Sequence, residues 1–210
     1  MRRFIILYGA LAIAAAFPAA SAPNANLFVS KSDPALTLRI DGRFKAVPRI
    51  RIPLEGTVVA ERSIFVEGRK GEPVRSVIIV QAEHVLPGKD FRYRFPAKPP
   101  HKFGAQTYGL MTFAYDEAAE AKKNSDNEIG ATREALRARG YRPAKLYRVA
   151  RLARVANSAG THEIIIFLFE NIDGEPSRGP EDLDGGWALT PAEKEAVVKR
   201  LEAAVRVIKG

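Results

Sequence analysis

Apolar and polar residues alternate with a period of two along much of residues 36–115, which predicts extended strands. Short strands are expected at residues 36–40 and 49–52, and longer ones at residues 57–66 and 74–86. The longer pair is joined by EGRKGEP, whose glycines and proline are typical of a turn. These two strands are therefore expected to form a hairpin.

Further strands are indicated before residue 116. In FRYRF, three aromatic residues alternate with Arg92 and Arg94, which is the period of a half-buried strand. The prolines and glycine of AKPPHKFG predict a loop, and the composition of QTYGLMTFAY after it favours another strand. The first half of the chain is therefore expected to build an antiparallel sheet.

Helical patterns begin after these strands. Strong helix formers follow Asp116, and Ser125 with Glu128 three residues later resembles a capping box. Because Gly140 is a typical helix stop, a helical segment is expected over about residues 116–139.

The C-terminal helix has the strongest local signal in the chain. Thr190, Pro191 and Glu193 supply an N-cap, a proline at the first helical position and a capping-box acid. Apolar residues then recur on one side at helical spacing. This pattern predicts a long helix over about residues 191–208 that packs on the sheet.

The segment between the helices, RPAKLYRVARLARVANSAGTHEIIIFLFE, fits two structures. As a helix, residues 144–156 gather their arginines on one side and their apolar residues on the other. Tyr147, Val149 and Val155 favour a strand instead, and NSAGT is a turn before the β-branched run EIIIFLF. We favour a β-hairpin, because the apolar strand needs a neighbour, and keep the helix as the alternative.

Together these elements predict an α+β protein with a single domain. A mainly antiparallel sheet is covered by the helical segment at about 116–139 and by the long C-terminal helix at about 191–208. The element order over residues 36–208 resembles that of the Mog1/PsbP-like α/β/α sandwiches, whose exported members act as small accessory or binding modules. A helix-grip or cystatin-like arrangement has a similar order and stays open as an alternative. The resemblance carries no motif and transfers no functional residue.

The N-terminus has the three parts of a secretory signal peptide. Arg2 and Arg3 precede an uncharged run over residues 4–17, and small residues end at Ala22. We expect cleavage after Ala22, which leaves one exported domain over residues 23–210, periplasmic or secreted, with no transmembrane helix. An uncleaved anchor is the alternative, although the run is shorter than the roughly 20 residues that span a bilayer. The chain has no cysteine, so no disulfide supports it.

The formal net charge of +9 at pH 7 is unevenly distributed. Residues 135–162 contain seven basic residues and no acidic one. Such a block predicts a surface for an anionic partner, because arginine contacts phosphate or carboxylate through paired N–H groups. The residues expected to bind the anion are Arg142, Lys145, Arg148, Arg151 and Arg154, with Arg92 and Arg94 as a second contribution.

Pairing within the fold is the alternative explanation, since the flanking segments 116–134 and 163–210 are acidic. Replacing Arg148, Arg151 and Arg154 by glutamine distinguishes the two. Loss of salt-sensitive association with intact folding indicates a binding surface, whereas unfolding indicates internal pairing. The expected partner is an anionic lipid head group, a polysaccharide or an acidic protein, and not nucleic acid, from which export separates the chain.

Signatures of the common enzyme classes are absent from the sequence, which has no cysteine nucleophile, Gly-x-Ser-x-Gly elbow, Walker loop or His-Glu-x-x-His motif. His84, His101 and His162 lack the spacing of a local metal pair, and the acidic loop NIDGEPSRGPEDLDGGW lacks the EF-hand ligand pattern. We therefore expect no metal, no cofactor and a non-catalytic binding or accessory protein of the cell envelope. A periplasmic hydrolase with a dispersed histidine and carboxylate site is one alternative, and a scaffold for another envelope protein is the other.

Overall fold

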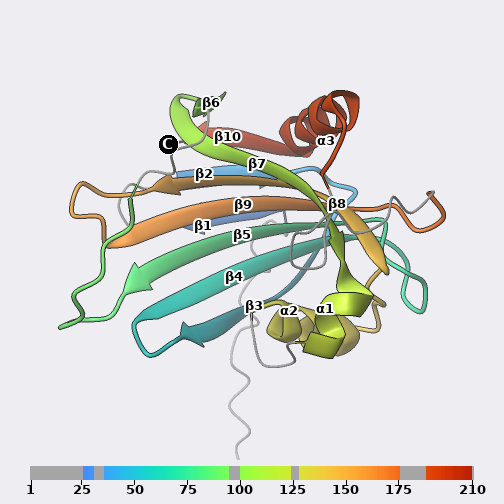
Figure 1. Cartoon of the computed structure of the whole chain (residues 1–210), viewed down its shortest axis with the longest axis horizontal. Helices are drawn as coiled ribbons and strands as arrows, with labels where there is room; N and C mark the ends of the chain where they lie inside the picture. Colours follow the sequence, from blue (N-terminus) through green and yellow to red (C-terminus); the bar gives the residue numbers. More distant parts are fainter. Residues whose placement is uncertain (1–25, 31–35, 95–99, 124–127, 176–187, 210) are drawn as a thin grey trace, which may run out of the picture.

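The computed structural model describes most of the chain in five stretches: residues 26–30, 36–94, 100–123, 128–175 and 188–209. The predicted signal peptide, the Ser125 capping residue and most of the acidic loop lie outside these stretches. Within them the chain has the expected α+β fold, dominated by antiparallel strands (Figure 1).

The main sheet has seven antiparallel strands in the order β3-β4-β5-β9-β8-β7-β6. Two predicted hairpins form its centre, and the second of them confirms the strands favoured for residues 144–156. The strands are β3 (Lys45–Leu54), β4 (Val58–Glu67), β5 (Ser76–Val85), β6 (Pro100–Phe103), β7 (Gln106–Asp116), β8 (Leu146–Val155) and β9 (His162–Asn171).

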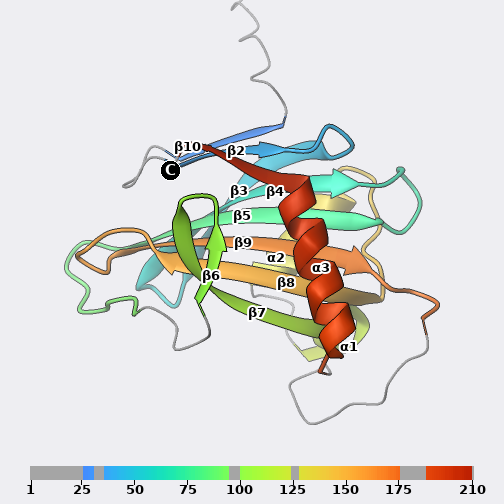
Figure 2. The same cartoon turned by 90° about the horizontal axis from the view of Figure 1, so that it is seen from above.

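One side of this sheet, called the α3 face here, is covered by a helix and a second sheet (Figure 2). The helix is α3 (Pro191–Ala204), whose Thr190 and Glu193 form the predicted capping box. The second sheet has the order β1-β2-β10, with β1 (Leu27–Ser30), β2 (Leu36–Ile40) and β10 (Val205–Lys209). The larger hydrophobic core lies between these layers, so the apolar stripe of α3 is used for packing.

The opposite side, called the α2 face, is covered only in part. Two short helices, α1 (Glu117–Lys123) and α2 (Glu128–Arg137), lie over one end of it (Figure 1). A smaller core forms beneath them, where Leu136 of α2 packs with Val77 and Val149 of the sheet. None of the helices in the described stretches is long and apolar enough to cross a bilayer.

The predicted helix boundaries needed correction. The C-terminal helix ends at Ala204 rather than at residue 208, and residues 205–209 form β10, which pairs with β2. The β-branched residues in VRVIK favour a strand, and pairing with β2 stabilises the strand over a continued helix. The segment at 116–139 contains two helices, and the second ends at Arg137.

Two predictions around residue 95 were also wrong. Residues 91–94 of FRYRF are not a strand. The N–H of Tyr93 donates to the Gly160 carbonyl, but no ladder forms around this bond within the described part of the chain. Residues 100–103, predicted as loop, form the edge strand β6. Pro100 occupies the first position of that strand, where a missing N–H is tolerated.

The tip of the β6–β7 hairpin packs tightly on β10. Gly104 has a positive φ of 61°, and a Cβ placed there would lie 2.8 Å from Val207 Cγ2. Gly56 has a similar φ of 63° but open space around it. We expect Gly104→Ala to reduce the free energy of unfolding by about 2–3 kcal/mol and Gly56→Ala by about 1 kcal/mol, measured by chemical denaturation. Equal losses in the two variants would show that the hairpin tip moves away from Val207 at no cost in stability.

Candidate functional site

The seven basic residues predicted to bind an anion do not form one surface. Side chains of a strand alternate between the two faces of its sheet, so positions three apart in β8 point in opposite directions. Arg148 and Arg154 therefore lie on the α3 face with Leu152, whereas Arg151 lies on the α2 face with Val149.

Arg148 is held by acidic groups of the fold. Its residue is only 8% exposed, and its guanidinium lies 3.3 Å from Glu170, 2.6 Å from Glu175 and 3.4 Å from Glu193. These contacts join β8 to β9 and to the first turn of α3. Internal pairing, the alternative to a binding surface, therefore describes the geometry of Arg148.

Arg151 and Arg154 have different surroundings. Arg151 lies 3.8 Å from the Glu163 carboxylate and 5.8 Å from the centre of the Phe167 ring. Arg154 is only 5% exposed and lies over the Tyr108 ring at 5.6 Å. Neither arginine presents a free guanidinium at the outer surface.

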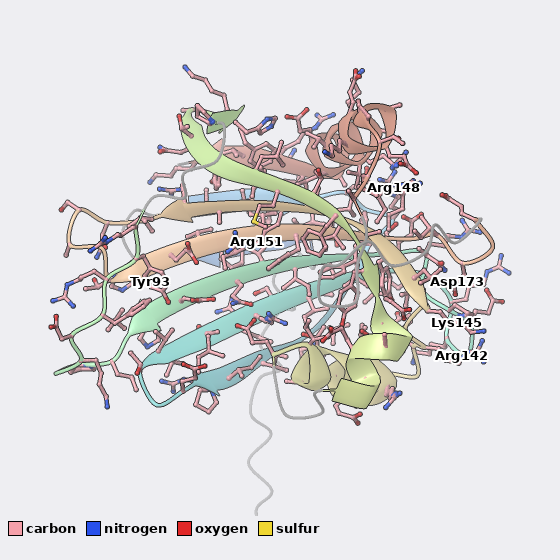
Figure 3. The ribbon with its side chains drawn as sticks, viewed as in Figure 1. Tyr93, Arg142, Lys145, Arg148, Arg151 and Asp173 are labelled. Atoms are coloured by element: carbon pink, nitrogen blue, oxygen red, sulfur yellow. The ribbon has the colours of Figure 1, made fainter. Side chains whose placement is uncertain are left out.

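Arg92 and Arg94 are exposed, but they lie far from Arg142 and Lys145. The segment that carries them is hydrogen-bonded to the β8–β9 turn through Tyr93 and Gly160. Figure 3 shows Tyr93 at one end of the molecule and Arg142 and Lys145 at the other. The structure therefore places these two groups of predicted anion-binding residues at opposite ends of the molecule.

A basic surface does form around Arg142 and Lys145, from two connections distant in sequence. The turn between β4 and β5 and the connection between α2 and β8 are joined by backbone hydrogen bonds, from Gly71 N to Gly140 O (2.8 Å) and from Val74 N to Arg142 O (2.9 Å). The arginine at 142 also forms a β-bridge with Pro73. We name this surface the basic end and define it by five exposed basic residues of the two connections, Arg69, Lys70, Arg139, Arg142 and Lys145.

The basic end has an excess of positive charge. None of its five side chains forms an ion pair within the described stretches, and Arg137 beside it pairs with Glu134. Two acids contact the same connections: Glu72 lies in the turn, and the Asp173 carboxylate accepts hydrogen bonds from the backbone N–H groups of Lys145 and Leu146. Five exposed positive charges thus outnumber the two acids that contact these connections.

Arg69 and Lys70 were missed by the sequence analysis, and Arg139 was noted only as part of the charged block. The signal for the first two is their place in the turn EGRKGEP, where exposed residues are expected. What the sequence does not indicate is that this turn contacts the connection before β8.

A second polar cluster lies on the α2 face, around the buried Arg62. Its guanidinium lies 2.7 Å from Glu128 of α2, and it also donates hydrogen bonds to Thr132 and Gln81. Burial lowers the pKa of Arg62, and the carboxylates of Glu128 and Glu83 counteract part of this effect. The cluster attaches the N-terminal end of α2 to β4 and β5.

Two glutamates oppose each other beside this cluster. Glu83 of β5 and Glu163 of β9 are register partners on the α2 face, and Tyr93 donates a hydrogen bond of 2.5 Å to Glu83. Burial raises the pKa of Glu163 to about 7, Arg151 opposes this shift, and Glu83 and Glu128 add to it. Near neutral pH this carboxyl group is therefore partly protonated.

The three histidines fall in two places, and one of them pairs with a carboxylate. His84 and His162 face each other at 6.3 Å on β5 and β9 and line a pocket with Glu61, while His101 lies 2.8 Å from Glu202. In the described stretches, neither pocket histidine is hydrogen-bonded to a carboxylate, and Glu61 pairs with Arg49 at 3.6 Å. No group of three or more metal-binding side chains occurs in the same stretches.

No protein-family model, curated protein or solved structure matches this chain. The geometry and charge of its surfaces therefore have to support any proposal for its function.

Proposed function

We propose that this chain is a non-catalytic binding protein of the cell envelope that docks on an anionic membrane surface through the basic end. The observation that carries the proposal is the grouping of five exposed basic residues, which form no ion pair within the described residues, on two hydrogen-bonded connections. The envelope location rests on the N-terminal sequence, which has the pattern of a signal peptide.

A lipid surface suits the shape of the basic end. Arg142 and Lys145 lie at one tip of the molecule (Figure 3), and backbone hydrogen bonds join their connection to the exposed turn that carries Arg69 and Lys70. Each basic residue near an anionic bilayer contributes about 1 kcal/mol to binding, and the attraction falls off within a Debye length of about 8 Å at physiological salt. Association is therefore expected to be reversible and salt-sensitive.

Co-sedimentation with vesicles tests this proposal. We expect the purified protein to sediment with vesicles that contain phosphatidylglycerol at low salt, to bind less at 0.15 M salt, and to stay in solution with phosphatidylcholine alone. Equal binding to both vesicle types would mean that charge does not drive the contact. Binding to neither vesicle type would exclude a membrane as the partner. An anionic polysaccharide or an acidic protein would then be tested.

A further inference from the structure

A groove lies on the α3 face, at the same end of the molecule as the basic end. It has a volume of about 520 Å³, within the range of roughly 300–1,000 Å³ found for small-molecule sites. Asp173 lines the groove, and its carboxylate accepts a hydrogen bond from the N–H of Lys145, beside which Figure 3 shows it. The charged and polar groups of the lining include Arg43, Glu67, Arg75, Ser76, Glu170 and Arg200.

Three neighbouring strands supply the floor of the groove. Ser76 of β5 is the register partner of Glu67 in β4 and of Glu170 in β9. Side chains two positions apart share a face, and Ile78 of β5 belongs to the larger core on the α3 face. The floor is therefore a row of polar side chains across the end of the α3 face, with Ser76 at its centre.

Both glutamates of this row are neutralised by arginines of the fold. Glu67 lies 3.4 Å from the Arg43 guanidinium, and Glu170 lies 2.6 Å from Arg200 and 3.3 Å from Arg148. The side chains of Arg43 and Arg200 are nevertheless 48% and 41% exposed. Because a guanidinium has five N–H donors, each of these two arginines keeps donors for a ligand after pairing with its glutamate.

Arg75 and Ser76 add donors that the fold does not use. Arg75 is exposed, and its side chain forms no hydrogen bond or ion pair within the described part of the chain. The same is true of the Ser76 hydroxyl among the described residues. The charge of the groove that is left without a partner is therefore positive, although its lining has as many acids as arginines.

We propose that this groove binds the phosphate of an anionic phospholipid head group. The phosphodiester carries one negative charge, and its oxygens accept hydrogen bonds from Arg75 and Ser76 and from the remaining N–H groups of the two paired arginines. A head group that ends in a neutral alcohol is favoured over one that ends in an ammonium group, because Glu67 and Glu170 already have cationic partners. The inference rests on the proposed function, since docking through the basic end brings the head group to this groove.

Thermal denaturation with glycerophosphoglycerol, the head group of phosphatidylglycerol without its acyl chains, tests the groove apart from any membrane. At about 10 mM and constant ionic strength, we expect it to raise the melting temperature by about 3–5 °C, and glycerophosphocholine to raise it by less than about 1 °C. Arg75→Gln and Ser76→Ala should each reduce the shift to less than about half. Arg69→Gln is the matched control, because Arg69 lies in the same turn but outside the lining of the groove, and it should retain the shift.

Three results would overturn the inference. A shift that persists in both Arg75→Gln and Ser76→Ala would place the head group elsewhere on the protein. Loss of the shift in Arg69→Gln as well would assign it to the charge of the basic end. An equal shift with glycerophosphocholine would contradict the preference for a head group without an ammonium group.

Vesicle binding separates this inference from the proposed function. Arg75→Gln leaves the basic end intact, so its co-sedimentation with phosphatidylglycerol vesicles should fall by less than about threefold. A protein that sediments with these vesicles but shows no shift with glycerophosphoglycerol would exclude the groove and keep the basic end as the docking surface. A protein that shows the shift but does not sediment would support the groove and exclude membrane docking.

Discussion

Replacing Glu163 by glutamine is expected to stabilise the protein above pH 7 and to have little effect near pH 4.5. The pKa of this carboxyl group is raised from 4.5 to about 7 in the folded state, chiefly by burial and also by Glu83 and Glu128, with Arg151 opposing. The folded protein therefore holds a proton that the unfolded chain releases. The contribution of this carboxyl group to the free energy of unfolding is fully present below pH 4.5. It is lost as the pH rises through 7, and the loss is at most about 3 kcal/mol.

The measurement is chemical denaturation of both proteins between pH 4.5 and 8. The difference in the free energy of unfolding between Glu163→Gln and the unsubstituted protein should grow with pH over this range. Glu134→Gln, in an exposed ion pair with Arg137, serves as the control and should change stability by less than about 0.5 kcal/mol at every pH. A difference for Glu163→Gln that stays constant with pH would show that its carboxyl group titrates normally in the folded protein.

Arg148→Gln is expected to reduce the free energy of unfolding by about 2–4 kcal/mol. The substitution removes the cation that Glu170, Glu175 and Glu193 share, and Glu170 keeps its contact of 2.6 Å with Arg200. Breaking a buried ion pair from one side costs about 3–5 kcal/mol, and the partial exposure of Glu175 reduces this cost.

Lys145→Gln is the matched control, because Lys145 is exposed and its side chain forms no ion pair in the described stretches. It should change stability by less than about 0.5 kcal/mol in urea denaturation. If Arg148→Gln left the unfolding midpoint unchanged but weakened vesicle binding, Arg148 would belong to the binding surface and not to the internal network.

Much of the fold could be predicted from local patterns. The β4–β5 and β8–β9 hairpins follow from β-branched runs separated by glycine-containing turns, and the start of α3 follows from its capping box. β10 was missed because its apolar residues continue the helical spacing of α3, and only pairing with β2 makes them a strand. The strand β6 was missed because its pairing with β7 outweighs the loop signal of the prolines in AKPPHKFG.

The candidate site was predictable only in part. Arg148, Arg151 and Arg154 gather on one side of a helix, but in a strand the same spacing sends them to different faces. Arg142 and Lys145 were identified as members of the basic block of residues 135–162, and both lie before β8 and are exposed. Their association with Arg69 depends on a tertiary contact between distant connections, which no local pattern encodes.

Two multiple variants test the central claim, that the basic end docks on an anionic surface. The first replaces its five members by glutamine, and the second replaces five exposed basic residues on other elements: Arg51, Lys89, Arg94, Lys102 and Arg206. Both variants lose five charges, so they differ only in where the charge is removed. Co-sedimentation with phosphatidylglycerol vesicles at low salt should fall at least tenfold for the first variant and by less than about threefold for the second. Equal losses would mean that net charge alone attracts the protein, and full binding by the first variant would contradict the account.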